Sequence, residues 1–236
     1  MTRPTRTPSL LLAATVALAG WGLALPAGAQ SFADQGTFEV SVDGRPAGSE
    51  EFSIRRSGSG EQAETVATGR VSLRLPTGSV ELSTSLRAAG ARSNPVSYQV
   101  QVGGSSPRKI VGAVEEGRFS ARISTPAGEQ LKEYVVSGGA LVLDDGVAHH
   151  YYFLAQRAAD GRVPVIIPRS NRQVVATISS RGDETIRVGG TPVRARRLVV
   201  RTEGGSEAEV WVDGRNRVLR VDVPASGYSA VRASAP

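Results

Sequence analysis

The sequence predicts a mainly β protein, a curved antiparallel sheet or open β-barrel of about a dozen strands with one helix. Apolar residues alternate with polar ones along most of the chain from Phe38 onward. Turn residues such as Asp-Gly and Gly-Gly interrupt this alternation at the short spacing typical of β-sandwiches and barrels. Only residues 146–159 carry helical signals. A strand with one polar face is typical of antiparallel sheets. Because no low-complexity linker and no Pro/Ser-rich stretch divides residues 30–236, we expect a single domain there.

In the N-terminal half, the first strand places Phe38, Val40 and Val42 on one face, and the segment 43–46 turns the chain. Further strands are expected at residues 52–54, 66–75, 80–86, 96–102, 109–114, 119–123 and 131–136. Between residues 66 and 75 the apolar positions change parity across Gly69. A glycine at such a change predicts a β-bulge.

The C-terminal half repeats the strand and turn pattern. Strands are expected at residues 140–143, 173–180, 185–188, 193–202, 206–212 and 217–223. The tripeptide Arg181-Gly182-Asp183 is predicted to be a turn between two of them. The apolar run 163–167 contains Pro164 and is followed by Pro168, and proline cannot donate to a sheet ladder. That run is therefore predicted to be an edge strand or an extended loop.

The expected helix begins after Asp144-Asp145-Gly146 and ends at Asp160-Gly161. One of its faces is apolar, and the opposite face carries His149, Tyr152 and Gln156. The apolar stripe consists of Val147, Tyr151, Leu154, Ala155 and Ala158. Aromatic residues at helical spacing mostly belong to a core, so we favour a helix that plugs the open side of a curved sheet. A helix that plugs the sheet can also line a cavity.

The alternative is that this helix presents a ligand-facing patch. Three aromatic residues and both histidines of the chain occupy positions 149–153, although only 5% of residues are aromatic. Aromatic rings supply contact area, and imidazole and phenol groups orient a ligand by hydrogen bonds. The predicted ligand-binding residues are His149, His150, Tyr151, Tyr152, Phe153 and Arg169. Arg169 and Arg172 have either an anionic group or Asp144 and Asp145 as partners, and we favour the aspartates.

Residues 1–29 have the pattern of a secretory signal peptide. Arg3 and Arg6 precede an apolar run, and small residues precede a predicted cleavage after Ala29. The apolar segment from Leu10 to Leu25 contains two glycines and is shorter than the ~20 residues that span a membrane. We therefore expect a periplasmic or secreted protein with no stable membrane anchor after cleavage. Because the chain has no cysteine, we also expect no lipid-modified cysteine and no disulfide.

Several function classes lack the residues that they need. The sequence contains no nucleophile elbow, Walker loop, dinucleotide fingerprint or HExxH motif. Adjacent histidines on a helix point about 100° apart, so no metal site and no cofactor is predicted. The net charge of +6 falls to +4 when the two arginines of residues 1–29 are removed, and no exposed aromatics accompany it. Nucleic-acid binding is therefore not expected, and the oligomeric state is left open.

Two segments resemble known proteins. The strand and turn Phe38-x-Val40-x-Val42-Asp43-Gly44-Arg45-Pro46-x-Gly48 resembles the opening of uncharacterised periplasmic β-rich families. The segment from Val210-Trp211 through Asp213-Gly214 to Val221 is similar to the C-terminal part of these families, a tryptophan-containing strand, an Asp-Gly turn and a returning apolar strand. These families look like relatives of the bacterial lipoprotein-carrier half-barrel. The resemblance implies a curved antiparallel sheet around a hydrophobic cavity that a helix covers.

We rank three hypotheses for the function. The first is a non-enzymatic protein that binds or carries an apolar or amphipathic ligand, such as a lipid or an acyl chain. The second is an envelope assembly or interaction protein that recruits a partner by a sheet edge near Val163–Ile167. The third is a hydrolase or metal enzyme that uses His149, His150, Tyr152 and the two neighbouring aspartates.

Overall fold

The computed structural model describes Met1 and residues 31–104, 106–136, 139–204 and 207–236. Apart from Met1, the predicted signal peptide, residues 1–29, lies outside the described residues. Fifteen strands of the described chain form one sheet. They are β1 (Ser31–Val42), β2 (Arg45–Ser57), β3 (Glu64–Leu75), β4 (Gly78–Ala89), β5 (Asn94–Gly104), β6 (Arg108–Glu115), β7 (Arg118–Thr125), β8 (Gly128–Val135), β9 (Leu141–Val142), β10 (Arg162–Ile167), β11 (Arg172–Val188), β12 (Thr191–Thr202), β13 (Glu207–Val212), β14 (Val218–Val223) and β15 (Tyr228–Arg232).

Most strands of the sheet pair with their neighbours in sequence, and the two halves, β1–β8 and β9–β15, join where β1 pairs with β15. Its order is β8-β7-β6-β5-β4-β3-β2-β1-β15-β14-β13-β12-β11-β10-β9. All neighbours are antiparallel except β9 and β10, which are parallel. The first and last strands, β1 and β15, pair from Phe38–Arg232 to Val42–Tyr228. The predicted fold class, a mainly β curved sheet with one helix, is confirmed, with more strands than the expected dozen.

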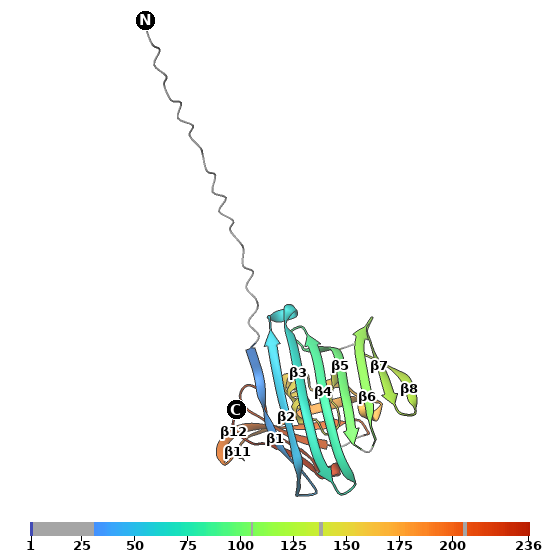
Figure 1. Ribbon diagram of the computed structural model, residues 1–236. Helices are drawn as coiled ribbons and strands as arrows, with labels where there is room; N and C mark the ends of the chain where they lie inside the picture. Colours follow the sequence, from blue (N-terminus) through green and yellow to red (C-terminus); the bar gives the residue numbers. More distant parts are fainter. Residues whose placement is uncertain (2–30, 105, 137–138, 205–206) are drawn as a thin grey trace.

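The helical segment lies inside the curve of the sheet, between its two halves (Figure 1). The α-helix itself, α1 (Tyr151–Gln156), is shorter than the expected helix. Short 3-10 turns extend it at both ends: η2 (Ala148–His150) before it and η3 (Ala158–Asp160) after it. Three more short 3-10 turns, η1 (Gly60–Gln62), η4 (Pro168–Ser170) and η5 (Pro224–Ser226), connect strands.

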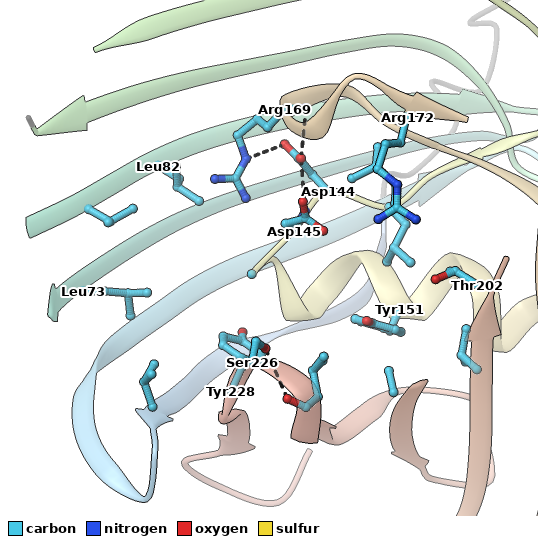
Figure 2. Close-up of a pocket in the computed structure, with 18 of the residues that line it drawn as sticks. Leu73, Leu82, Asp144, Asp145, Tyr151, Arg169, Arg172, Thr202, Ser226 and Tyr228 are labelled. Atoms are coloured by element: carbon cyan, nitrogen blue, oxygen red, sulfur yellow. Dashed lines mark hydrogen bonds and ion pairs between the residues drawn. The ribbon is translucent and has the colours of Figure 1, made fainter. Parts of the chain in front are cut away.

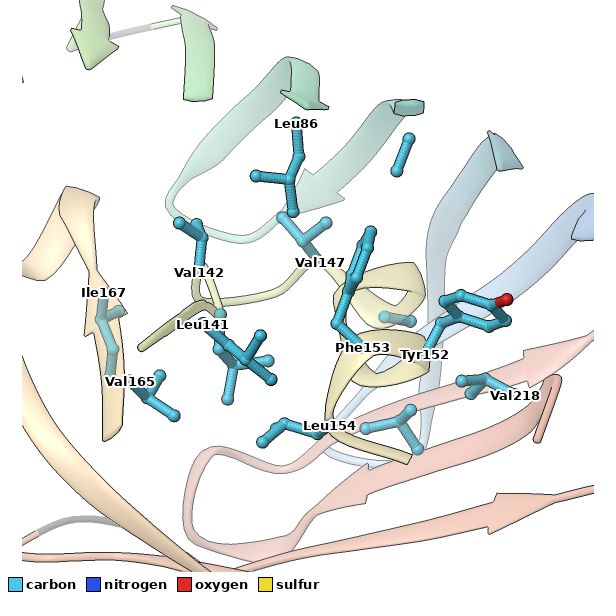
Figure 3. Close-up of a cluster of buried hydrophobic side chains, with 14 of the residues drawn as sticks. Leu86, Leu141, Val142, Val147, Tyr152, Phe153, Leu154, Val165, Ile167 and Val218 are labelled. Atoms are coloured by element: carbon cyan, nitrogen blue, oxygen red, sulfur yellow. The ribbon is translucent and has the colours of Figure 1, made fainter. Parts of the chain in front are cut away.

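This segment fills the interior. The side chains of Tyr152, Phe153 and Leu154 are buried, at 5%, 1% and 1% exposure. Figure 3 shows Phe153 and Leu154 among apolar side chains of β4, β9 and β10. The helical segment therefore packs inside the curved sheet, as the favoured interpretation predicted. We call this segment, residues 148–160, the helical plug.

The predicted β-bulge at Gly69 is wrong, because β3 pairs with both of its neighbours without a register shift. The inward series runs unbroken through Ala67, Gly69 and Val71, and both Ala67 and Val71 are fully buried. Val66 and Thr68 point outward, where Val66 is half-buried and Thr68 exposed. Because the side chains of Val66 and Thr68 are apolar or β-branched, the sequence pattern wrongly assigned them to the buried face, and the buried positions seemed to shift by one residue at Gly69.

The predicted turn at Arg181-Gly182-Asp183 is also wrong. These residues lie within the continuous strand β11, and the pairing of β11 with β12 shifts between Ser180 and Asp183. An extra residue in one strand of an antiparallel pair makes a β-bulge, and a glycine at positive φ suits it. Gly182 has a φ of 94°.

The segment Val163–Ile167 is not an exposed edge, which corrects the second hypothesis. It belongs to β10, whose Val165 and Ile166 pair with Leu141 and Val142 of β9. Its four apolar residues are between 0% and 4% exposed. The two residues of β9 form the edge of the sheet beside β10, so Pro164 lies in the second strand from the edge, whereas Pro168 begins η4.

The two ends of the sheet approach each other without closing a barrel by backbone pairing. A side-chain hydrogen bond of 2.9 Å links the edge strand β8 to the connection between β10 and β11, because the Tyr134 hydroxyl donates to the Asn171 side chain. The architecture is thus barrel-like and open. Across the described residues, no helix has the length and apolar character that crossing a membrane requires.

Candidate functional site

A mainly apolar pocket of about 410 Å³ lies in the interior, between the two halves of the sheet. Its lining residues come from both halves and from the helical plug. They are Val42, Leu73, Leu75, Val80, Leu82, Leu143, Asp144, Asp145, Gly146, Tyr151, Ile167, Arg169, Arg172, Val200, Thr202, Ala208, Val223, Ser226 and Tyr228. Most of them are drawn in Figure 2.

Strand periodicity explains the apolar lining. Leu73 and Leu75 lie two positions apart on β3, as Val80 and Leu82 do on β4, so the two side chains of each strand lie on the same face of the sheet. In both strands this is the concave face that lines the pocket. Val200 of β12 reaches the pocket from the other half of the sheet. The helical plug fills one end of the interior and leaves the other end open. A cavity of this size, in which apolar side chains and converging polar groups line the same space, is typical of small-molecule sites.

A buried ion pair borders the pocket. The Asp144 carboxylate, in a residue that is 1% exposed, accepts hydrogen bonds from Arg169 Nε at 2.9 Å and from the Tyr98 hydroxyl at 2.6 Å. Figure 2 shows this pair beside Asp145. Burial, together with the Asp144 charge, raises the pKa of Tyr98 well above its usual value, so the phenol stays a donor. The predicted partnership of Arg169 with an aspartate is confirmed, whereas Arg172 contacts the Glu203 carbonyl oxygen at 3.4 Å.

Two tyrosines bring polar groups to the pocket wall. Within the described residues, the buried Tyr228 hydroxyl has no hydrogen-bond partner. Burial raises the pKa of Tyr228 well above its usual value, and burial also raises the pKa of Tyr151. Both phenols are therefore neutral donors at ordinary pH. A buried hydroxyl without a partner costs free energy that a ligand could recover by a hydrogen bond.

A second polar cluster lies behind the pocket and is closed to solvent. Glu50 of β2 and His149 are both 0% exposed, and Glu50 Oε1 is 2.6 Å from His149 Nδ1. The same carboxylate accepts the backbone N–H groups of Ala148 at 2.7 Å and His149 at 2.9 Å. Glu50 thus satisfies the otherwise unpaired donors at the start of η2. The cluster fixes the plug to the sheet.

His150 completes this cluster on its other side. The Asp144 backbone N–H donates to His150 Nδ1 at 3.1 Å, so a neutral ring carries its proton on Nε2. Burial, with the nearby His149 and Arg169, lowers the pKa of His150 well below its usual value. The Nε2 atoms of both histidines are buried and lack a partner among the described residues.

The structure separates the predicted ligand-binding residues into two groups. Tyr151 and Arg169 line the apolar pocket. His149, His150, Tyr152 and Phe153 lie outside its lining and are at most 5% exposed. A role of these residues in ligand binding stays a prediction. In the described residues no group of three or more His, Cys, Asp and Glu side chains is arranged to hold a metal ion.

Sequence reasoning missed Glu50, Tyr98 and Tyr228. Glu50 has the same parity along β2 as the buried Phe52 and Ile54, so an acidic residue on an apolar face was a readable signal of a buried, paired charge. Tyr98 lies in an expected strand, at residues 96–102, whereas Tyr228 lies in β15, after the last strand that the sequence predicted. Nothing in the sequence relates either of them to Asp144 or to the pocket.

The fold and the site together define a class: an open, barrel-like antiparallel sheet with a helical plug and an interior apolar pocket. One solved structure, the "Beta-barrel-like Protein of Domain of Unknown Function DUF1849 from Brucella abortus", is similar, with a TM-score of 0.53 and 10% sequence identity. The similarity covers 84% of this chain and 93% of that one and concerns the fold. No family model matches the chain, and no curated protein matches it in sequence.

Proposed function

We propose that this chain is an exported, non-enzymatic binding protein that holds an apolar or amphipathic ligand, such as a lipid or an acyl chain, in its interior pocket. The apolar pocket between the two halves of the sheet carries this proposal. Nine of its nineteen lining residues are Leu, Val or Ile, and contact of their side chains with an acyl chain removes apolar surface from water. Export is proposed from the signal-peptide pattern of residues 1–29.

The polar groups of the site support binding better than catalysis. The two histidines are fully buried behind the pocket, so neither imidazole can reach a substrate there without opening the plug. Asp144 is occupied by Arg169 and Tyr98. The remaining polar groups, including the Tyr228 hydroxyl, are suited to orienting a ligand. Like the lipoprotein-carrier half-barrel that the sequence resembles, the molecule would then use its curved sheet as a container.

A fluorescent fatty-acid analogue tests the proposal. We expect saturable binding to the wild-type chain and at least tenfold weaker binding to Leu82→Trp, because the indole would occupy the pocket that Leu82 lines. The matched control is Leu131→Trp, since Leu131 is 65% exposed on β8 and lies outside the pocket. Circular dichroism of both variants checks that they fold.

Native mass spectrometry after gentle purification provides a second readout, in which co-purifying lipid should appear with the wild-type chain and not with Leu82→Trp. The proposal is overturned when the wild-type chain binds no acyl probe. It is equally overturned when Leu82→Trp folds and binds as well as Leu131→Trp.

A further inference from the structure

A second, basic pocket lies next to the apolar one. It is lined in part by β6, β7 and β8, which form one end of the sheet (Figure 1). Its volume is about 290 Å³. Its lining residues are Arg108, Ile110, Ile123, Thr125, Gln130, Lys132, Pro168, Arg169 and Asn171. Three of these side chains are cations and none is a carboxylate. A concave site that collects three cations without an acid is a candidate anion site.

Two of the three cations in this basic pocket have no acidic partner in the described part of the chain, and the third, Arg169, shares its charge with Asp144. Arg108 and Lys132 form no ion pair within the described residues, and the buried Nε of Arg108 has no hydrogen-bond partner there. Arg169 keeps its Nε bond to Asp144, and its two terminal nitrogens make no hydrogen bond among the same residues. A buried guanidinium donor without an acceptor is unfavourable, and a bound oxyanion would supply the acceptor.

Strand register directs these cations inward and the nearby acids outward. Arg108 has the parity of the buried Ile110, and Lys132 has the parity of the buried Tyr134. The acids of β8 have the opposite parity: Glu129 accepts a hydrogen bond from Ser124 at 2.9 Å, and Glu133 is 3.4 Å from Arg118. The positive charge of the pocket is therefore a consequence of the pattern along β6 and β8, where inward positions usually carry apolar side chains.

Arg169 connects the two sites, because it lines both the apolar pocket and the basic pocket. We infer that the ligand is an amphiphile with a phosphate-class head group. Its acyl chain lies in the apolar pocket, and its head group binds Arg108, Lys132 and Arg169 in the basic pocket. This inference rests on the proposed function and adds the chemical class of the head group. Guanidinium groups suit such a head group because they bind phosphate oxygens in a bidentate manner.

The test compares two monoacyl amphiphiles of equal chain length, a monoacylglycerol phosphate and the neutral monoacylglycerol, with inorganic phosphate as a third ligand. We expect the wild-type chain to bind the phosphate amphiphile at least tenfold more tightly than the neutral one. Arg108→Gln and Lys132→Gln should each weaken binding of the phosphate amphiphile about tenfold and leave binding of the neutral one unchanged. Isothermal titration at two salt concentrations measures both, and the difference should shrink at high salt.

Lys109→Gln is the matched control. Lys109 is the only other lysine of the chain, lies next to Arg108 on β6 and is exposed on the opposite face. Its replacement removes the same charge and should leave both affinities unchanged. Equal affinity of the wild-type chain for the two amphiphiles would overturn the inference while leaving the proposed function intact. Binding of inorganic phosphate as tight as that of the phosphate amphiphile would overturn the assignment of the anion to a lipid. If neither amphiphile binds, the proposed function itself fails.

Discussion

At the scale of single residues, packing in the interior depends on a glycine, Gly69, and on two buried histidines, His149 and His150. Gly69 occupies an inward position of β3, and a Cβ atom there would lie 2.4 Å from His149 Cε1 and 2.9 Å from His149 Nδ1. The His149 ring also stacks on Phe52, with 5.7 Å between ring centroids. The absence of a side chain at Gly69 therefore leaves the room that the His149 ring occupies.

Replacing Gly69 by alanine should destabilise the fold. The added methyl group overlaps an imidazole that Glu50 holds in place, so we expect the free energy of unfolding to fall by about 1–3 kcal/mol, the usual cost of overpacking. Urea denaturation followed by tryptophan fluorescence measures this. Gly214→Ala is the control, because a Cβ atom there meets nothing within 4 Å. A Gly69→Ala variant as stable as Gly214→Ala would contradict the packing.

His150 should make the fold less stable in mild acid. Its pKa is lowered well below the usual value by burial and by the neighbouring His149 and Arg169. The unfolded chain binds a proton near pH 6.5 and the folded chain does not, so stability falls as the pH drops below about 6.5, by up to about 1.4 kcal/mol per pH unit. The Asp144 backbone N–H also holds the ring in its neutral form, since it donates to His150 Nδ1.

The measurement is urea denaturation between pH 7.5 and pH 5.0. His150→Asn keeps an acceptor for the Asp144 N–H and removes the titrating ring, so its stability should depend less steeply on pH than that of the wild-type chain, by about one proton. Parallel pH profiles for the two proteins would show that His150 is not the group responsible.

At the scale of elements, the joint between β1 and β15 holds the two halves of the sheet together. Arg232 of β15 binds Asp34 of β1 through two nitrogens, at 2.7 Å and 3.1 Å, and both side chains are at most 3% exposed. The Arg232 guanidinium also donates to the Gln35 carbonyl oxygen and lies over the Phe52 ring at 5.3 Å. This pair joins residues 198 positions apart, so it forms only when the whole sheet is assembled.

Removing one partner of this pair should be costly. Asp34→Asn leaves the Arg232 charge buried without its counterion, and we expect a loss of about 3–5 kcal/mol in the free energy of unfolding. Asp183→Asn is the matched control, because the Asp183–Arg194 pair is exposed and such pairs contribute about 0–1 kcal/mol. Thermal and urea denaturation of the two variants should differ clearly, and equal stabilities would refute a structural role of the buried pair.

At the scale of the whole molecule, the helical plug covers part of the concave face of the open sheet, and its position determines where the pockets lie. α1 has only six residues, too few to be stable alone in water, so its helical form depends on burial against the sheet. It fills one end of the interior. The apolar pocket and the adjoining basic pocket remain at the other end.

Export is testable on the whole chain. Expressed in a Gram-negative host, the protein should appear in the periplasmic fraction with an N-terminus at Gln30, because small residues precede the predicted cleavage after Ala29. Ala29→Arg, which places a bulky charge at the cleavage position, should leave an uncleaved precursor. Mass spectrometry of the intact protein distinguishes the two forms. A cytoplasmic wild-type protein that retains residues 1–29 would overturn the proposal of export.

The fold class followed from local pattern. Alternation in strands such as β1 and β4 depends only on which side of a strand faces water, so it is visible in the sequence. The same logic failed at Val66 and Thr68, which have strand-forming side chains on the outer face. It also failed at Arg181-Gly182-Asp183, because a bulge and a turn use the same residues. Of the predicted ligand-binding residues, Tyr151 and Arg169 line the apolar pocket, and their role in binding stays a prediction, whereas Tyr98 and Tyr228 were not predicted.

By itself, the sequence determined the β architecture and the position of the helical segment, and it favoured an aspartate as the partner of Arg169. The tertiary structure alone decided that His149 and His150 are closed off, that Glu50 anchors the plug, and that two pockets share Arg169. The reason is physical. Periodicity reports one residue's exposure to water, whereas a pocket or a buried ion pair needs strands far apart in the chain to curve toward each other, and no local pattern records that curvature.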